Sequence, residues 1–300
     1  MPTIPYRGRF APSPTGPLHF GSLVTALASF LEARTSNGCW LVRIEDLDPL
    51  RESQSATTRI LASLDAHELH SDEPVRFQSD RREAYLAAIE QLRAQQQAYP
   101  CTCSRKELRE HPEHTETCRQ RAPVLPGTPH AIRFALQEQT FSWSDQLLGP
   151  QTLAIRAGVD DPVILRKEGF VAYQLAVVVD DIDQNISHVV RGSDLLDTTG
   201  QQQQIYRALN APLPSWLHIP VILNSSGQKL SKQTHAPALD DCQPAHNLVR
   251  ALAALGQNPP PTLRQSPVST VLAWAVEHWQ RDHVPRQPHQ EQPAPTLRNP

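Results

Sequence analysis

Residues 7–22 read RGRFAPSPTGPLHFGS, and this stretch decides the fold that we expect. Arg7–Ala11 is a predicted strand that ends at Pro12–Pro14, because proline cannot continue a strand ladder or enter a helix interior. Gly16 then allows a tight reversal of the chain. From Leu18 to Arg34 the apolar residues recur with a helical period. The sequence therefore predicts a strand, a rigid turn and a helix in close succession.

The start of this predicted helix has the chemistry of a phosphate site. The first turn of a helix carries unpaired N–H groups and the positive end of the helix dipole. His19 can donate to a phosphate oxygen, and Gly21 leaves room for a nucleotide against the backbone. Taken alone, however, a His-x-Gly sequence is usually an ordinary loop.

A second polar segment, residues 229–233 with the sequence KLSKQ, carries two lysines three residues apart. Lys229 and Lys232 can neutralise the charge that develops when the α-phosphate of ATP is attacked and pyrophosphate leaves. Such a loop alone is usually a solvated surface. Together and in this order, however, the two segments resemble the two signature motifs of the class I aminoacyl-tRNA synthetases, and this resemblance implies ATP-dependent activation of an amino acid. The predicted catalytic residues are His19, Gly21, Lys229 and Lys232, and the same residues together with Ser22 are predicted to bind ATP.

Length and composition bound the class of protein. With 300 residues the chain has room for one large or two smaller domains, and a hydrophobic share of 39% is enough for a core. The net charge of −3 excludes a globally basic nucleic-acid binder, so a tRNA would need local patches such as Arg105, Lys106 and Arg109. We find neither an apolar run of membrane-spanning length nor a signal-peptide pattern, and we therefore expect a cytoplasmic protein without membrane contact.

Residues 1–98 alternate strands and helices, which predicts an α/β fold with a parallel sheet. Cys39–Ile44 is typical of a buried strand, and a helix follows near Ser55–Leu69. Asp80 and Glu83 have the spacing of a capping box, which predicts another helix that runs to about residue 98.

The pattern changes at residues 99–166, where cysteines, proline-rich loops and short alternating strands such as Ala131–Leu136 predict an insertion. We expect the parallel-sheet pattern to resume within residues 167–240. Its predicted segments are 170–181, His188–Arg191, a helix near Thr199–Leu209 and a strand at His218–Leu223. For residues 241–300 we expect two helices, near His246–Leu255 and Ser269–Gln280, and a disordered tail after His283.

Six segments carry a family resemblance: GRFAPSPTG (8–16), LHFGS (18–22), VRIEDLD (42–48), AYQLAVVVDD (172–181), VRGSDL (190–195) and KLSKQ (229–233). Their order and spacing resemble the glutamyl/glutaminyl branch of the class I aminoacyl-tRNA synthetases. The resemblance implies a Rossmann-type parallel-sheet catalytic domain, here with a zinc-bearing insertion and a short helical C-terminal region.

The chain differs in length from full glutamyl-tRNA synthetases, which carry a large anticodon-reading helical domain after the second motif. Only about 70 residues follow that motif here, and we expect no such domain among them. The chain thus resembles the glutamyl-queuosine tRNA(Asp) synthetases. This implies tRNA-independent activation of L-glutamate by ATP, with Mg²⁺, and transfer to the queuosine base at the wobble position of tRNA(Asp), by a monomer. The alternatives are a minimal glutamyl-tRNA synthetase and a non-catalytic, zinc-bearing RNA-binding module.

An acidic substrate also agrees with the residues at the predicted strand ends, where ligands of parallel sheets bind. Arg9 at the first strand end can form a bidentate pair with a side-chain carboxylate. The resemblance implies that Glu45 holds the substrate ammonium and that Tyr173 and Arg191 complete the pocket. The alternatives are packing for Tyr173 and, for Arg191, an ion pair with Asp194 or Asp197. The predicted glutamate site comprises Arg9, Phe10, Ala11, Pro12, Ser13, Glu45, Tyr173 and Arg191.

Cys101, Cys103 and Cys118 form the second chemical signal. The odd total of five cysteines argues against a disulfide framework, and three neighbouring thiols are typical of a zinc site, although reduced cysteines without metal are the alternative. In the resembling family a tyrosine usually stands four positions before the last cysteine, where this chain has His114. We predict His114 as the fourth ligand of a structural zinc ion, with His111 as the alternative.

Overall fold

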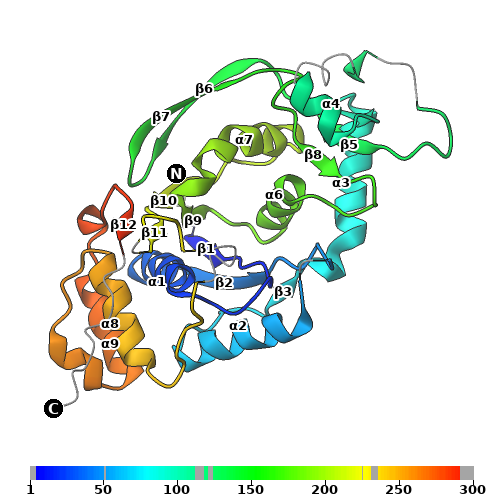
Figure 1. The fold of residues 1–300 in the computed structure, drawn as a ribbon. Helices are drawn as coiled ribbons and strands as arrows, with labels where there is room; N and C mark the ends of the chain where they lie inside the picture. Colours follow the sequence, from blue (N-terminus) through cyan, green and yellow to red (C-terminus); the bar gives the residue numbers. More distant parts are fainter. Residues whose placement is uncertain are drawn as a thin grey trace.

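The computed structural model describes residues 5–50, 52–111, 118–120, 124–224, 226–230 and 236–290. Its central strands are β1 (Arg7–Phe10), β2 (Cys39–Ile44), β3 (Arg76–Phe77), β9 (His188–Gly192) and β10 (Ser215–Ile219). All pairings among them are parallel, in the groups β1-β2-β3 and β9-β10. The N–H of Ser187 donates to the carbonyl of Arg7 at 3.0 Å, so β9 lies beside β1 and the two groups continue one another (Figure 1). This confirms the expected α/β class with a parallel sheet.

Helices cover both faces of these strands (Figure 1). They are α1 (Phe20–Thr35), α2 (Gln54–Ala66), α3 (Arg82–Ala94), α6 (Tyr173–Asp183) and α7 (Thr199–Ala208), with the 3₁₀ turns η1 (Gln78–Arg81) and η2 (Ser193–Thr198). Successive residues of a strand point to opposite faces. Accordingly, Trp40 and Val42 of β2 are buried in the cluster that contains α1, and Leu41 between them is buried in the cluster that contains α3, α6 and α7.

The insertion forms antiparallel structure. It contains β4 (Ala98–Cys101), α4 (Arg105–Glu110), β5 (Ala131–Phe134), the hairpin β6 (Gln139–Asp145) and β7 (Gly149–Ile155), and β8 (Val163–Leu165). The hairpin reaches back to the parallel strands, because the N–H of Gln146 donates to the carbonyl of Trp216 on β10 at 2.8 Å. In Figure 1 the hairpin arches over α7 toward β10.

The last part of the chain packs beside α1. It comprises β11 (Ile222–Leu223), α8 (Pro244–Ala254), η4 (Pro261–Gln265), α9 (Val268–His278), η5 (Arg281–His283) and β12 (His289–Gln290). Leu248 and Leu252 of α8 are buried in the same cluster as Leu27 and Leu31 of α1. Within the described ranges, no helix has the length and apolar character needed to cross a bilayer.

Two expectations for the helices were wrong. Residues 173–183 form the helix α6 instead of continuing the sheet, because a short buried apolar run fits a helix as well as a strand. The capping box is absent as well: α3 begins at Arg82 without a side-chain cap, and Asp80 lies in the preceding 3₁₀ turn. That helix ends at Ala94, before Ala98 enters β4.

Two further expectations changed near the end of the parallel strands. The predicted strand at 218–223 is divided into β10 and β11, since Pro220 lies between them and has no N–H for a ladder. In the tail, which we expected to be disordered, residues 289–290 pair in parallel with 222–223. Residues 291–300 lie outside the described part of the chain.

Candidate active site

A cavity of about 780 Å³ opens where β1, β2 and β9 end. The carboxyl ends of neighbouring parallel strands are the usual ligand site of such a sheet. Its lining includes the predicted residues Arg9, Phe10, Ala11, Pro12, Ser13, His19, Gly21, Ser22, Glu45, Tyr173, Arg191 and Lys229. The fold thus brings both signature segments to one cavity, although they are about 200 residues apart in the sequence.

The first turn of α1 forms one part of the cavity wall. The helix begins at Phe20, and the Nδ1 atom of His19 accepts the N–H of Ser22 at 3.3 Å as its N-cap. The hydroxyl of Ser22 lies 3.1 Å from Nε2 of the same ring. A Cβ atom on Gly21 would stand 3.3 Å from the His19 ring. A larger residue at position 21 would crowd the His19 imidazole, so glycine allows the ring to take this position.

Lys229 lines the same cavity, with its Nζ atom 2.5 Å from Oδ2 of Asp194. Both side chains are partly exposed, so this ion pair is readily exchanged for a ligand. Among the described residues, neither Asp194 nor Asp197 forms an ion pair with Arg191, so that alternative is not observed. Lys232 lies outside the described residues.

Arg9 lies at the closed end of the cavity and is buried. Its Nε and Nη2 atoms donate to the carboxylate of Asp181 at 3.1 Å and 3.3 Å, and Nη1 of Arg43 donates to the same carboxylate at 2.7 Å. Burial opposes ionisation of Asp181, but the charges of the two arginines hold its pKa below the ordinary value. The Nη1 atom of Arg9 makes no hydrogen bond to any described residue, which leaves a donor for a ligand.

Arg191 is also buried, and its partners are uncharged. Its Nε donates to Nε2 of His218 at 2.9 Å, and Nη1 donates to the amide oxygen of Gln202 at 2.7 Å. Its Nη2 donates to the hydroxyl of Thr199 at 2.9 Å and to the carbonyl of Leu195 at 3.3 Å. Burial lowers the pKa of Arg191. In the described part of the chain, no carboxylate forms a hydrogen bond or an ion pair with this guanidinium, and the charge of Asp181 acts on it only at longer range.

Glu45 follows β2 and is buried at the cavity wall. Burial raises the pKa of Glu45 to about 7, although the charges of Arg43 and Arg9 oppose this rise. Tyr173, the first residue of α6, faces the same cavity, and burial raises the pKa of its hydroxyl. The closed end of the cavity therefore combines two arginines with one carboxyl group that a bound cation would ionise.

Residues 6–244 match the family model described as tRNA synthetases class I (E and Q), catalytic domain. The chain belongs to this family. Glutamyl-Q tRNA(Asp) synthetase of Xanthomonas axonopodis pv. citri (strain 306) is 49% identical over 288 residues, which span 96% of this chain and 95% of that protein. Glutamyl-Q tRNA(Asp) synthetase of Methylococcus capsulatus is 44% identical over 285 residues, which span 95% and 94%. These matches confirm the resemblance seen in the sequence motifs, and they make the protein a ligase.

A solved structure agrees with this family. Glutamate-tRNA synthetase from Elizabethkingia anophelis superposes with a TM-score of 0.77 at 24% identity, over 96% of this chain and 68% of that chain. The likeness shows a common fold, namely the class I catalytic domain.

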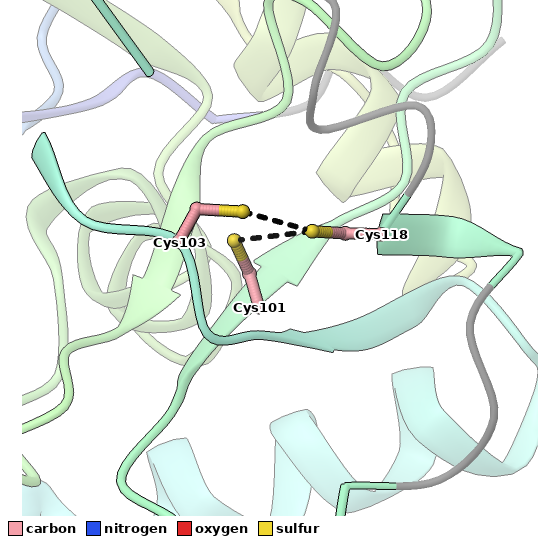
Figure 2. Close-up of side chains that lie close together, drawn as sticks. All are labelled: Cys101, Cys103 and Cys118. Carbon is pink, nitrogen blue, oxygen red and sulfur yellow. Dashed lines mark hydrogen bonds between the residues drawn. The ribbon is translucent and has the colours of Figure 1, made fainter. Parts of the chain in front are cut away.

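The three cysteines lie together in the insertion, and Figure 2 shows their sulfur atoms turned toward one another. The Sγ atoms of Cys101, Cys103 and Cys118 are buried and lie within 4.8 Å of one another. Tetrahedral zinc with bonds of about 2.3 Å separates two sulfurs by about 3.8 Å. The Sγ atoms of Cys101 and Cys118 are 3.8 Å apart, whereas those of Cys103 and Cys118 are 3.0 Å apart and would have to separate.

The predicted fourth ligand, His114, lies outside the described residues. The alternative ligand, His111, ends α4 and is exposed, and within the described ranges the metal-ligating cluster consists of the three cysteines alone. The cluster thus offers three of the four ligands that a closed zinc site needs.

Sequence reasoning missed three residues that support the cavity: Asp145, Asp181 and His218. The signal for His218 was its place in the strand S-W-L-H-I, where it interrupts an apolar run. The signal for Asp181 was a pair of aspartates directly after three valines. Asp145 gave no such signal, because it is the last residue of the largely exposed hairpin strand β6.

Proposed function

We propose that the protein activates L-glutamate with ATP in the absence of tRNA, and then transfers the glutamyl group to the queuosine base at the wobble position of tRNA(Asp). The observation that carries the proposal is the buried guanidinium of Arg191, whose described partners are all uncharged. A buried charge without a counter-charge is costly unless a ligand supplies one. A substrate carboxylate is such a ligand.

In this proposal the closed end of the cavity binds glutamate. Arg9 binds the side-chain carboxylate through Nη1, and Arg191 with Tyr173 completes the carboxylate pocket. Glu45 holds the ammonium group, which favours the ionised form of its carboxyl. The segment from Phe10 to Ser13 forms the wall beside the substrate.

ATP binds at the start of α1 in the same proposal. His19, Gly21 and Ser22 bind its phosphates with the first N–H groups of the helix, and Mg²⁺ accompanies the nucleotide. An oxygen of the α-carboxylate attacks the α-phosphorus, the bond to the bridging oxygen breaks, and pyrophosphate leaves. Lys229 and Lys232 stabilise the charge of the leaving group. The queuosine base then attacks the carbonyl carbon of the adenylate, and AMP leaves.

The acceptor is inferred from the relatives. Proteins named Glutamyl-Q tRNA(Asp) synthetase are 44% to 49% identical and are matched over 94% to 95% of their length. We further propose that residues 1–98 and 167–240 form the two halves of the catalytic domain around the insertion 99–166, with residues 241–300 as a short helical region.

The cysteine cluster serves a structural role in this proposal. Cys101, Cys103 and Cys118 hold one zinc ion, with His114 as the fourth ligand. The three thiols are buried in a small cluster apart from both main hydrophobic cores, and a metal ion stabilises such a small unit.

Glutamate-dependent exchange of pyrophosphate into ATP, measured without tRNA, tests the activation step. We expect exchange with glutamate, and at most weak exchange with glutamine or aspartate at equal concentration. Exchange that requires added tRNA would contradict the proposed tRNA-independent activation. Exchange that is equal for glutamine would contradict the roles of Arg9 and Arg191.

A further inference from the structure

The orientation of Arg191 depends on a histidine in the neighbouring strand. Arg191 on β9 and His218 on β10 are direct partners in the parallel register, and Nε of Arg191 lies 2.9 Å from Nε2 of His218. The Nδ1 atom of His218 lies 2.6 Å from Oδ2 of Asp145. Asp145 is the last residue of β6 and belongs to the insertion hairpin. His218 has no exposed surface, and Asp145 is 2% exposed.

Chemistry fixes the protonation of this chain of bonds. A guanidinium nitrogen only donates, so Nε2 of His218 must accept from Arg191. The ring proton then lies on Nδ1 and is donated to Asp145. The other carboxylate oxygen of Asp145 accepts the N–H groups of Leu147 and Leu148 at 3.0 Å and 2.9 Å. The hairpin turn thereby fixes the carboxylate, the carboxylate fixes the tautomer, and the tautomer presents an acceptor to Arg191.

We infer that Asp145 and His218 are positioning residues, which orient Arg191 toward the substrate carboxylate without neutralising its charge. A carboxylate placed directly against Arg191 would orient the guanidinium equally well, but it would compete with the substrate. An imidazole between Asp145 and Arg191 supplies the orientation and keeps the negative charge one residue away. This inference rests on the proposed glutamate pocket.

A second chain of hydrogen bonds between uncharged groups also connects Arg191 to the insertion. The amide oxygen of Gln202 accepts from Arg191, and its Nε2 donates to Gln174 at 2.9 Å. Gln174 donates to Gln201 at 3.0 Å, and Gln201 donates to the carbonyl of Asp160 at 3.0 Å. The short glutamine run of α7 therefore connects Arg191 to the insertion through oriented amides. The insertion thus reaches the hydrogen-bond network of Arg191 at two points, the side chain of Asp145 and the backbone carbonyl of Asp160.

Two substitutions at one position separate the two bonds of the imidazole. In His218→Asn the side-chain amide reaches the place of Nδ1, so the hydrogen bond to Asp145 is kept and the hydrogen bond from Arg191 is lost. In His218→Gln the amide oxygen reaches the place of Nε2, so it keeps an acceptor for Arg191. Pyrophosphate exchange should show a KM for glutamate that rises on the order of 10- to 100-fold in His218→Asn, with an unchanged KM for ATP, and partial recovery in His218→Gln.

Asp145→Asn tests the tautomer. Because two N–H groups fix the carbonyl side, the new NH₂ group faces Nδ1, and the ring must carry its proton on Nε2, against the N–H of Arg191. We expect a similar rise in the KM for glutamate. The matched control is Asp161→Asn: Asp161 is an equally buried aspartate of the insertion, which accepts from Arg119 and Tyr99. It should lower the melting temperature and leave the KM for glutamate unchanged.

A second measurement does not depend on activity. Two-bond ¹H–¹⁵N spectra of protein labelled at histidine report which ring nitrogen carries the proton. The signals of the His218 ring are identified by their loss in His218→Gln, and in the wild type they should show the proton on Nδ1. In Asp145→Asn that ring should carry the proton on Nε2. A charged ring or an Nε2–H tautomer in the wild type would overturn the inference.

The kinetic outcomes separate the inference from the proposed function. If wild-type protein exchanges with glutamate, but His218→Asn and Asp145→Asn keep its KM, the positioning role is wrong and the proposed function stands. Parallel rises in the KM values of glutamate and ATP would also contradict positioning. If wild-type protein shows no exchange with glutamate, the proposed function fails, and the tautomer measurement still decides how Arg191 is held.

Discussion

Arg43 and Glu45 are two residues apart at the end of β2, and Nη2 of Arg43 lies 3.3 Å from Oε1 of Glu45. The same guanidinium makes a shorter bond, 2.7 Å, to Asp181. The Nε atom of Arg43 also lies 3.8 Å from Oδ2 of the buried Asp180, so Arg43 shares its charge among three buried carboxyl groups. Asp181 accepts a further hydrogen bond from Arg9. Glu45 is therefore less stabilised than Asp181, which agrees with its pKa of about 7.

This relationship predicts a pH-dependent affinity for glutamate. Only ionised Glu45 attracts an ammonium group, and the groups that act on its charge are Arg43, Arg9, Asp181 and Tyr173. Between pH 6 and pH 8 the ionised fraction of a group with a pKa of 7 rises roughly tenfold. We expect the KM for glutamate in pyrophosphate exchange to fall by about that factor, with a much smaller change in the KM for ATP. A pH-independent KM for glutamate contradicts this role for Glu45.

Glu45→Gln tests how the raised pKa of Glu45 affects the pH dependence of the free energy of unfolding. The folded protein holds the Glu45 proton up to a pH of about 7, whereas the ordinary value is 4.5. The folded state thus binds more protons in this window, and the free energy of unfolding falls as the pH rises through it. In urea denaturation, the wild type should lose stability relative to Glu45→Gln between pH 5 and pH 8. A constant difference between the two proteins would show that Glu45 titrates normally.

Arg9→Lys tests the carboxylate clamp while it keeps the charge beside Asp181. Lysine cannot reproduce the planar fork of arginine, so the KM for glutamate should rise about 10- to 100-fold while the KM for ATP changes little. Arg7→Lys is the matched control on the same strand, because Arg7 pairs with Glu73 away from the cavity. Equal changes in both KM values for Arg9→Lys would remove its assignment as the clamp.

Lys229→Ala and Lys232→Ala test the stabilisation of the leaving pyrophosphate. Each should lower the exchange rate by about 100- to 1,000-fold. The melting temperature should change little for Lys229→Ala, since its partly exposed ion pair with Asp194 contributes at most about 1 kcal/mol. Lys106→Ala, on the exposed α4, is the control and should keep full activity. Undiminished exchange in Lys232→Ala would exclude that lysine from the reaction.

Metal content tests the cysteine cluster. Native mass spectrometry should find one zinc ion per chain, which is lost in Cys103→Ser and retained in Cys242→Ser, because Cys242 is exposed and outside the cluster. His114→Ala should weaken zinc retention more than His111→Ala. Metal-free wild-type protein, or zinc that persists in Cys103→Ser, is the result that argues against the site.

Residues that end one element and allow the next explain why the start of the fold was predictable. Prolines and a glycine between β1 and α1 end one element and permit the next, so the strand and the helix follow from neighbouring residues. The positions of Arg9 and Glu45 follow from the same logic, because strand ends converge in a parallel sheet. Tyr173 and Arg191 were implied by the family resemblance. The bounds differed by one or two residues: β1 ends at Phe10 where Ala11 was predicted, and α1 spans Phe20–Thr35 where Leu18 to Arg34 was predicted.

The supporting residues depend on contacts between distant parts of the chain. Asp181 lies 172 positions from Arg9, and Asp145 lies 73 positions from His218. No spacing within one element indicates such pairs. The helix α6 was missed for a related reason: its valines are buried on both sides by tertiary packing, so the apolar run lost the helical period that would have identified it.

Transfer of labelled glutamate to tRNA tests the central claim most directly. The protein would be incubated with ATP, labelled glutamate and total tRNA from cells that make queuosine or lack it. The account predicts label on tRNA(Asp) only where queuosine is present, and label that stays on the RNA after removal of the 3′-terminal adenosine. Label that is independent of queuosine and leaves with that adenosine would contradict the account, and would instead indicate a minimal glutamyl-tRNA synthetase.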